Sequence, residues 1–81
     1  MNISSEIHVE NHCFIDEGVL IGYIGGREIS NKIIRIGRSA KIRSGTVIYA
    51  GTTIGDNLET GHNVVIREEN KIGKNLRIWN N

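Results

Sequence analysis

The chain has 81 residues, with 10 Lys and Arg against 9 Asp and Glu and a formal net charge of +1. This length allows one small domain, and the balanced charge gives no electrostatic basis for binding nucleic acid or an anionic membrane. No apolar stretch approaches the roughly 18–20 residues of a membrane span. Because Cys13 is the single cysteine, the chain cannot form an intrachain disulfide, which is consistent with a reducing cytoplasm.

A six-residue step opens the chain. Its members, which we call guide residues, are aliphatic: Ile3, Val9, Ile15 and Ile21. An α-helix with 3.6 residues per turn would spread such a period around its whole surface. A unit of one short strand and one turn accounts for the period, as in hexapeptide β-helix repeats. The fourth residue after each guide residue is usually small or apolar as well, which predicts two inward-facing positions in every hexad.

The step fails between Ile21 and Ile36, which are two and a half hexads apart rather than two or three. Gly25-Gly26 is a turn signal within this gap. We therefore predict a loop over residues 22–35 that leaves the repeat at a corner. Two interpretations remain open. The segment is either an irregular coil without a role, or a loop that reaches a substrate or a neighbouring subunit.

From Ile36 onward the step runs without a slip to the end of the chain. The guide residues are Ile36, Ile42, Ile48, Ile54, Thr60, Ile66, Ile72 and Ile78. An Ile-Gly pair recurs with every third hexad, at Ile36, Ile54 and Ile72, so three hexads make one coil and these three residues are predicted to stack. The third residue after a guide residue is most often Gly or Asn, which tolerate φ > 0 and mark the corners. Residues 1–81 are therefore predicted to form a single all-β domain, a parallel β-helix of about four three-sided coils.

The hexad pattern of aliphatic, Gly, any residue, Asn or Gly, small, any residue resembles the left-handed parallel β-helix of the hexapeptide-repeat acyltransferases. The segments 42–49 and 60–68 are especially similar to sugar-modifying members. The resemblance implies left-handed coils, a homotrimer, and acetyl-CoA as acyl donor in a groove between two prisms. It also implies a small-molecule acceptor, a sugar or sugar nucleotide, whose hydroxyl or amine is activated by a histidine base.

His62 fits that role by its motif, Thr60-Gly61-His62-Asn63. It is the second residue after a guide residue, so we expect it to project from a corner into solvent, where a base that titrates near neutral pH is useful. We also predict that Asn63 contacts substrate or coenzyme. The alternative is that His62 is an ordinary surface histidine. A zinc site would need three converging histidines, and His8 and His12 lie several coils away, so no metal is expected.

Arg43, Tyr49 and Arg67 are the other candidates for binding substrate or coenzyme A. Arg67 is predicted to stack one coil above Tyr49, and the two arginines could hold phosphates beside His62. The alternative is that they form ordinary ion pairs on a solvated surface. The glutamates available for such pairs are Glu59, Glu68 and Glu69.

The sequence stops in mid-coil after Ile78, at Trp79-Asn80-Asn81, with no cap. Proteins that the chain resembles continue for several coils, so we expect either the N-terminal portion of a longer transferase or an end covered by another copy, with end-to-end stacking as an addition to the trimer. Trp79 is expected to make a buried contact there. The alternative function, from a different class, is a non-catalytic β-helix that serves as an assembly or binding module.

Overall fold

The computed structural model describes residues 6–26 and 32–79, which contain β-strands and turns and no helix. None of these residues forms the long apolar helix that a membrane crossing requires. The strands are β1 (Glu6–Val9), β2 (Phe14–Ile15), β3 (Leu20–Tyr23), β4 (Ile33–Ile36), β5 (Lys41–Ile42), β6 (Val47–Tyr49), β7 (Thr53–Ile54), β8 (Glu59–Thr60), β9 (Val65–Ile66), β10 (Lys71–Ile72) and β11 (Arg77–Ile78).

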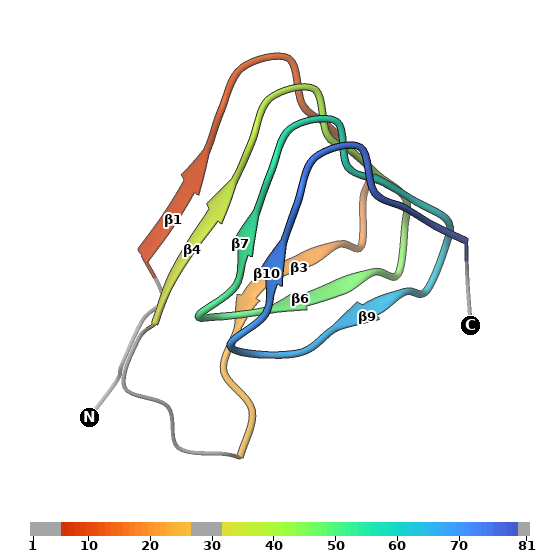
Figure 1. Cartoon of the computed structure of the whole chain (residues 1–81). Helices are drawn as coiled ribbons and strands as arrows, with labels where there is room; N and C mark the ends of the chain where they lie inside the picture. The colour runs from red at the N-terminus through yellow and green to blue at the C-terminus, as the bar shows by residue number, and fades with distance from the viewer. Residues whose placement is uncertain (1–5, 27–31, 80–81) are drawn as a thin grey trace.

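The strands form the three faces of a triangular prism (Figure 1). The first face has the order β1-β4-β7-β10, the second β2-β5-β8-β11 and the third β3-β6-β9, and the paired strands are parallel. In Figure 1 the chain rises along the first face, descends along the second and returns along the third, and later coils lie nearer the viewer. This winding is left-handed. The predicted fold class, a left-handed parallel β-helix, is confirmed.

The strand register agrees with the predicted stacking. Ile36 pairs with Ile54 and Ile54 with Ile72 on the first face, and Ile48 pairs with Ile66 on the third. Each of these partners lies three hexads from the next, because three hexads complete one coil.

The first coil follows a different offset. Val9 pairs with Ile36 and Ile21 with Ile48, so these partners lie four and a half hexads apart instead of three. The chain thus inserts a hexad and a half before the second coil. Strands β3 and β4 extend into both ends of the range 22–35, so the loop predicted there is shorter and lies between Tyr23 and Ile33. Its residues 27–31 lie outside the described part of the chain.

The core lies along the prism axis and is made by the two inward positions of each hexad. Its buried apolar members come from the second and third coils: Ile34, Ile36, Ala40, Ile42, Ile48, Ile54, Leu58, Val64 and Ile66. Thr46, Thr52 and Thr60 are buried with them, and their hydroxyl groups bond to neighbouring backbone or to each other. The described side chains therefore leave no buried polar atom without a partner.

The corners bend at the third residue after each guide residue, where φ is positive. This was predicted for Gly and Asn and holds at Gly18, Gly45, Gly51, Asn57, Asn63 and Asn75. His12, Ser39 and Glu69 occupy equivalent positions and adopt the same backbone, with φ of 65°, 61° and 62°. The geometry of the corner therefore overrides the preference of these three residues for negative φ.

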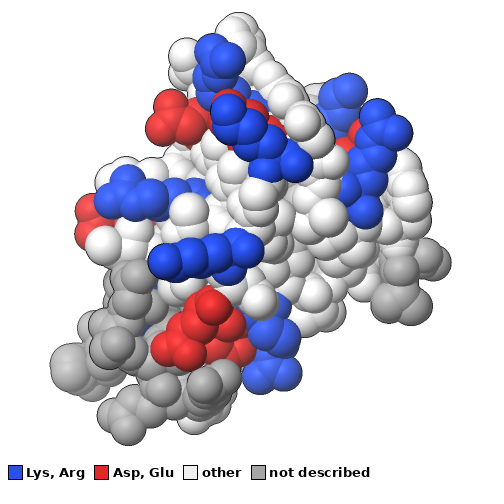
Figure 2. All heavy atoms as spheres, viewed as in Figure 1, with Lys and Arg blue, Asp and Glu red and all other residues white. Residues whose placement is uncertain are grey.

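The outward positions give the three faces different surfaces. The outward residues of the first face include Arg35, Thr53 and Lys71. On the second face they are Lys41, Glu59 and Arg77 together with the exposed Phe14. Figure 2 colours the charged side chains of the molecule. The third face carries an apolar row instead: Leu20, Val47 and Val65 pair in register, and Leu20 and Val65 are 53% and 56% exposed.

Candidate functional site

The predicted site residues divide between two corners at opposite ends of the third face. Arg43, His62 and Asn63 lie at the corner between the second and third faces, which we call the second corner. Tyr49 and Arg67 lie at the corner between the third and first faces, the third corner. The prediction that both arginines lie beside His62 is therefore wrong. Arg43 and Arg67 are separated by one coil plus one hexad, which places them one corner apart.

His62 is exposed at the second corner and is held by the coil before it. Its Nδ1 lies 2.8 Å from Oγ of Ser44, which precedes it by one coil and is therefore directly adjacent in the stack. The backbone N–H of Asn63 donates to the carbonyl oxygen of Ser44 at 3.0 Å, which fixes the same two corners together. Among the described residues no bond engages Nε2 of His62, so this nitrogen is open to solvent.

Ser44 is the member of this site that the sequence analysis missed. The signal was present in the one-coil spacing between Ser44 and His62, but the spacing gives only adjacency and not the direction of two side chains. A hydroxyl on Nδ1 orients the imidazole ring, and it accepts the Nδ1 proton in the tautomer that leaves Nε2 without one. In that tautomer Nε2 is the nitrogen that could accept a proton at the exposed side of the corner.

Asn63 helps to form the corner through its backbone conformation and its side-chain packing. It has φ of 60°, and its side chain lies against Gly45 on the preceding coil. A Cβ at Gly45 would overlap Oδ1 of Asn63, so Gly45 is needed both for its own positive φ and for this close approach. A contact between Asn63 and substrate stays a prediction.

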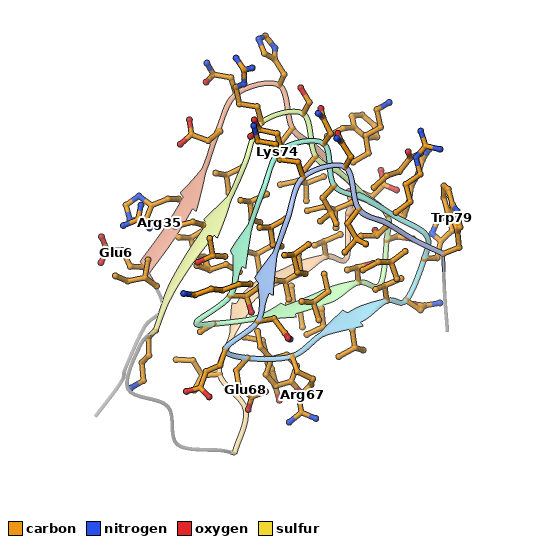
Figure 3. All side chains as sticks on the ribbon, in the orientation of Figure 1. Glu6, Arg35, Arg67, Glu68, Lys74 and Trp79 are labelled. Carbon is orange, nitrogen blue, oxygen red and sulfur yellow. The ribbon has the colours of Figure 1, made fainter. Side chains whose placement is uncertain are left out.

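Arg43 and Trp79 complete the second corner, with Gly61 between them in the stack. Arg43 is half-buried, and its backbone N–H donates to Oγ1 of the buried Thr60 at 3.0 Å. Trp79 projects from the corner and is 56% exposed (Figure 3), and the buried contact expected for it with a following segment or another copy stays a prediction. An aromatic residue and an arginine thus lie at the same corner as the histidine, one coil after and one coil before Gly61.

The third corner carries a cation–π stack. The guanidinium carbon of Arg67 lies 4.7 Å from the centre of the Tyr49 ring, as predicted from their spacing, and Tyr49 meets Tyr23 edge-on at 5.0 Å. Nε of Arg67 donates to Oε1 of Glu68 at 3.0 Å, so the alternative interpretation as an ion pair also holds. The hydrogen bond and charge of Glu68 raise the pKa of Arg67 above its ordinary value, and the guanidinium stays charged. Figure 3 shows Arg67 directed away from the prism.

Residues 6–26 and 32–79 contain no group of three or more His, Cys, Asp or Glu side chains arranged to hold a metal ion. The two corners carry an imidazole, guanidinium groups, the Glu68 carboxylate, hydroxyls and aromatic rings.

One comparison with known proteins finds the same six-residue repeat in this chain. Residues 33–68 match the family model described as bacterial transferase hexapeptide (six repeats). No curated protein and no solved structure matches the chain. The matched segment contains all five predicted site residues and Ser44. The match supports the hexapeptide-repeat transferase family, which the six-residue step and its Gly and Asn corners had indicated.

Proposed function

We propose that this chain acts in acyl transfer from acetyl-CoA to a hydroxyl or amino group of a sugar or sugar nucleotide, with His62 as the general base. The observation that carries the proposal is the pair of His62 and Ser44 on an exposed corner, 2.8 Å apart, with Nε2 of the histidine open to a substrate. A base of this kind suits proton abstraction near neutral pH.

In the proposed reaction Nε2 of His62 takes the proton of the acceptor hydroxyl or amine as that oxygen or nitrogen attacks the thioester carbonyl carbon. The new ester or amide bond forms and the carbon–sulfur bond breaks. The imidazolium then returns its proton to the departing thiolate, which leaves as the free thiol. Ser44, bonded to Nδ1, keeps the ring oriented.

The two corners offer cations for the phosphates of the donor. Arg67, stacked on the ring of Tyr49, is exposed at one end of the third face. Arg43 lies at the other end, at the same corner as His62. Arg67 is the fifth residue after His62, which limits the span between their Cα atoms to about 18 Å. The apolar row of Leu20, Val47 and Val65 lies between them and suits an aliphatic arm better than a charged one.

The same apolar row supports a homotrimer in which the third face packs against a neighbouring copy. Fully burying an exposed Leu or Val contributes about 1.5–3 kcal/mol, and Leu20 and Val65 are both more than half exposed. The donor would then lie between two prisms. This row is also what favours the second candidate function, a non-catalytic β-helix used for assembly or binding, because that function needs the face and not the histidine.

Thiol release from acetyl-CoA in the presence of a panel of amino sugars tests the proposal. His62→Ala should lower turnover by roughly 10²–10⁴-fold, the range for removal of a general base, with little loss of stability because the side chain is exposed. His12→Asn is the matched control: His12 is also an exposed corner histidine, and Asn tolerates its φ of 65°.

An unchanged rate in the His62 variant would remove it from the reaction. A folded wild-type protein that neither binds acetyl-CoA nor releases thiol would leave the assembly module as its function.

A further inference from the structure

The second face carries a groove of about 580 Å³ whose lining includes none of the residues named above for acyl transfer. One wall is formed by Ser39, Asn57 and Asn75, and the other by Lys41, Glu59 and Arg77. In Figure 2, basic side chains with acidic atoms between them mark this region at the upper right.

The repeat itself builds both walls. Ser39, Asn57 and Asn75 are corner residues with positive φ, and each follows the previous one by exactly one coil, so they stack. The second wall consists of the outward residues of three adjacent strands, and Glu59 pairs in register with both Lys41 and Arg77. Neighbouring strands are about 4.8 Å apart. The groove therefore presents regularly spaced polar groups along the prism axis.

The wall that contains Asn57 and Asn75, which we call the amide wall, has side-chain donor and acceptor atoms without a partner among the described residues. Nδ2 of Asn57 donates to Oδ1 of Asn75 at 2.9 Å. Within the described chain, no hydrogen bond is made by Oδ1 of Asn57 or Nδ2 of Asn75, so the pair keeps one acceptor and one donor oriented by their mutual bond. An acceptor and a donor on adjacent amides match neighbouring hydroxyl groups, each of which both donates and accepts.

The charged wall has a net positive charge. Arg77 and Glu59 form an ion pair with Nε 3.5 Å from Oε1. Lys41 makes no ion pair with the residues that the structure describes, and its side chain is exposed. The compact ammonium group of a lysine is a suitable partner for a carboxylate or phosphate.

We propose that this groove binds a small polyhydroxylated molecule with one anionic group, such as a sugar acid or a sugar phosphate. The anion lies at Lys41, and the hydroxyls bond to the Asn57–Asn75 pair. The proposal deepens the proposed function, on which it rests for the identity of this molecule as the acceptor. The amide wall lies at the corner between the first and second faces, and His62 lies at the opposite edge of the second face. His62 is the third residue after Glu59, which limits the span between their Cα atoms to about 11 Å.

Binding is measured without any acyl donor, by titrating ¹⁵N-labelled protein and following amide chemical shifts. The probes are glucuronate, glucose 1-phosphate, glucose and inorganic phosphate. The first two should give saturable shifts at Ser39, Lys41 and Asn57, and comparison of them distinguishes a carboxylate from a phosphate. Glucose and phosphate alone should bind roughly tenfold more weakly, since each offers half of the recognised chemistry.

Two variants make the test specific. Lys41→Ala should weaken glucuronate or glucose 1-phosphate by about tenfold, the loss of one charge-assisted bond, and Asn75→Gly should weaken it while keeping the corner, because Gly accepts its φ of 64°. The matched control is Lys71→Ala, which removes an exposed outward lysine from the first face.

Shifts that map away from the groove, an equal effect of the Lys71 variant, or no binding of either anionic sugar would overturn the proposal. Its failure is separable from that of the transferase. Acyl transfer that is unaffected by Lys41→Ala would leave the function standing without the groove, and groove binding without thiol release would leave the groove standing without the function.

Discussion

The first coil and the second coil contain mostly apolar residues in the same inward columns, yet of the two only the second has fully buried apolar side chains. On the second face Ile15 pairs with Ile42, and both point along the inward track. Ile15 is 39% exposed and Ile42 is fully buried. The hexad position thus fixes the direction of a side chain, whereas its burial requires a coil on each side.

The two coils also differ in how they use polar groups. The second coil has Thr46 in the column where the first has Val19. The hydroxyl of Thr46 donates to the carbonyl oxygen of Gly61 at 3.2 Å and accepts from the N–H of Val64 at 3.3 Å. The contact between the second and third coils therefore includes buried side-chain hydrogen bonds in addition to apolar packing.

The largest expected effect comes from truncating one isoleucine in each coil. Ile42→Ala should destabilise the fold by about 2–5 kcal/mol, because it leaves a cavity in a fully packed column. Ile15→Ala should cost less than half of that, since its side chain is already partly in water. Urea unfolding followed by circular dichroism measures both. Equal losses would show that the first coil is as tightly packed as the second.

Much of the fold could be predicted because the information is local and periodic. The step of six residues and the recurrence of Ile-Gly with every third hexad predicted the stacking of Ile36, Ile54 and Ile72, and the register confirms it. The offset of the first coil could not be derived, because the insertion interrupts the step and nothing in the pattern counts hexads across an insertion. The register of Ile21 with Ile48 resolves it.

The candidate site was predicted less completely than the fold. The position of His62 on an exposed corner follows from its place in the hexad, and the structure confirms the exposure. The bond from Ser44 depends on two side-chain rotamers, which a repeat pattern does not specify. The placement of Arg43 and Arg67 at different corners could have been predicted, because the spacing between them is not a whole number of coils.

A middle-sized effect should follow from removing the hydroxyl of Thr46. Thr46→Val keeps the shape of the side chain but leaves the carbonyl of Gly61 and the buried N–H of Val64 without this partner. A loss of about 2 kcal/mol is expected, within the range for an unsatisfied buried group. Thr53→Val is the control, since Thr53 is exposed on the first face and should change stability by no more than about 0.5 kcal/mol. Unaltered stability in the Thr46 variant would mean that packing alone joins these coils.

The smallest expected effect is the difference in stability between alanine substitutions at two equivalent glycines, one in each coil. Gly18 and Gly45 occupy the same corner column on the first and second coils, with φ of 80° and 79°. Alanine at either position adopts an unfavourable left-handed backbone, which costs about 1–2 kcal/mol. At Gly18 the added Cβ meets only the backbone nitrogen of Gly45, at an ordinary 3.8 Å, whereas at Gly45 it must displace the side chain of Asn63.

Gly45→Ala should therefore be the more destabilising of the two by about 1 kcal/mol, a typical loss for displaced packing and hydrogen bonding. The difference should vanish when Gly45→Ala is combined with Asn63→Gly, because the obstacle is then gone while the backbone at Asn63 keeps its positive φ. Thermal unfolding of five proteins measures these effects: the wild type, Gly18→Ala, Gly45→Ala, Asn63→Gly and the double variant Gly45→Ala/Asn63→Gly. A difference that persists in the Asn63→Gly background would place its origin in the backbone of the second coil and not in the contact between corners.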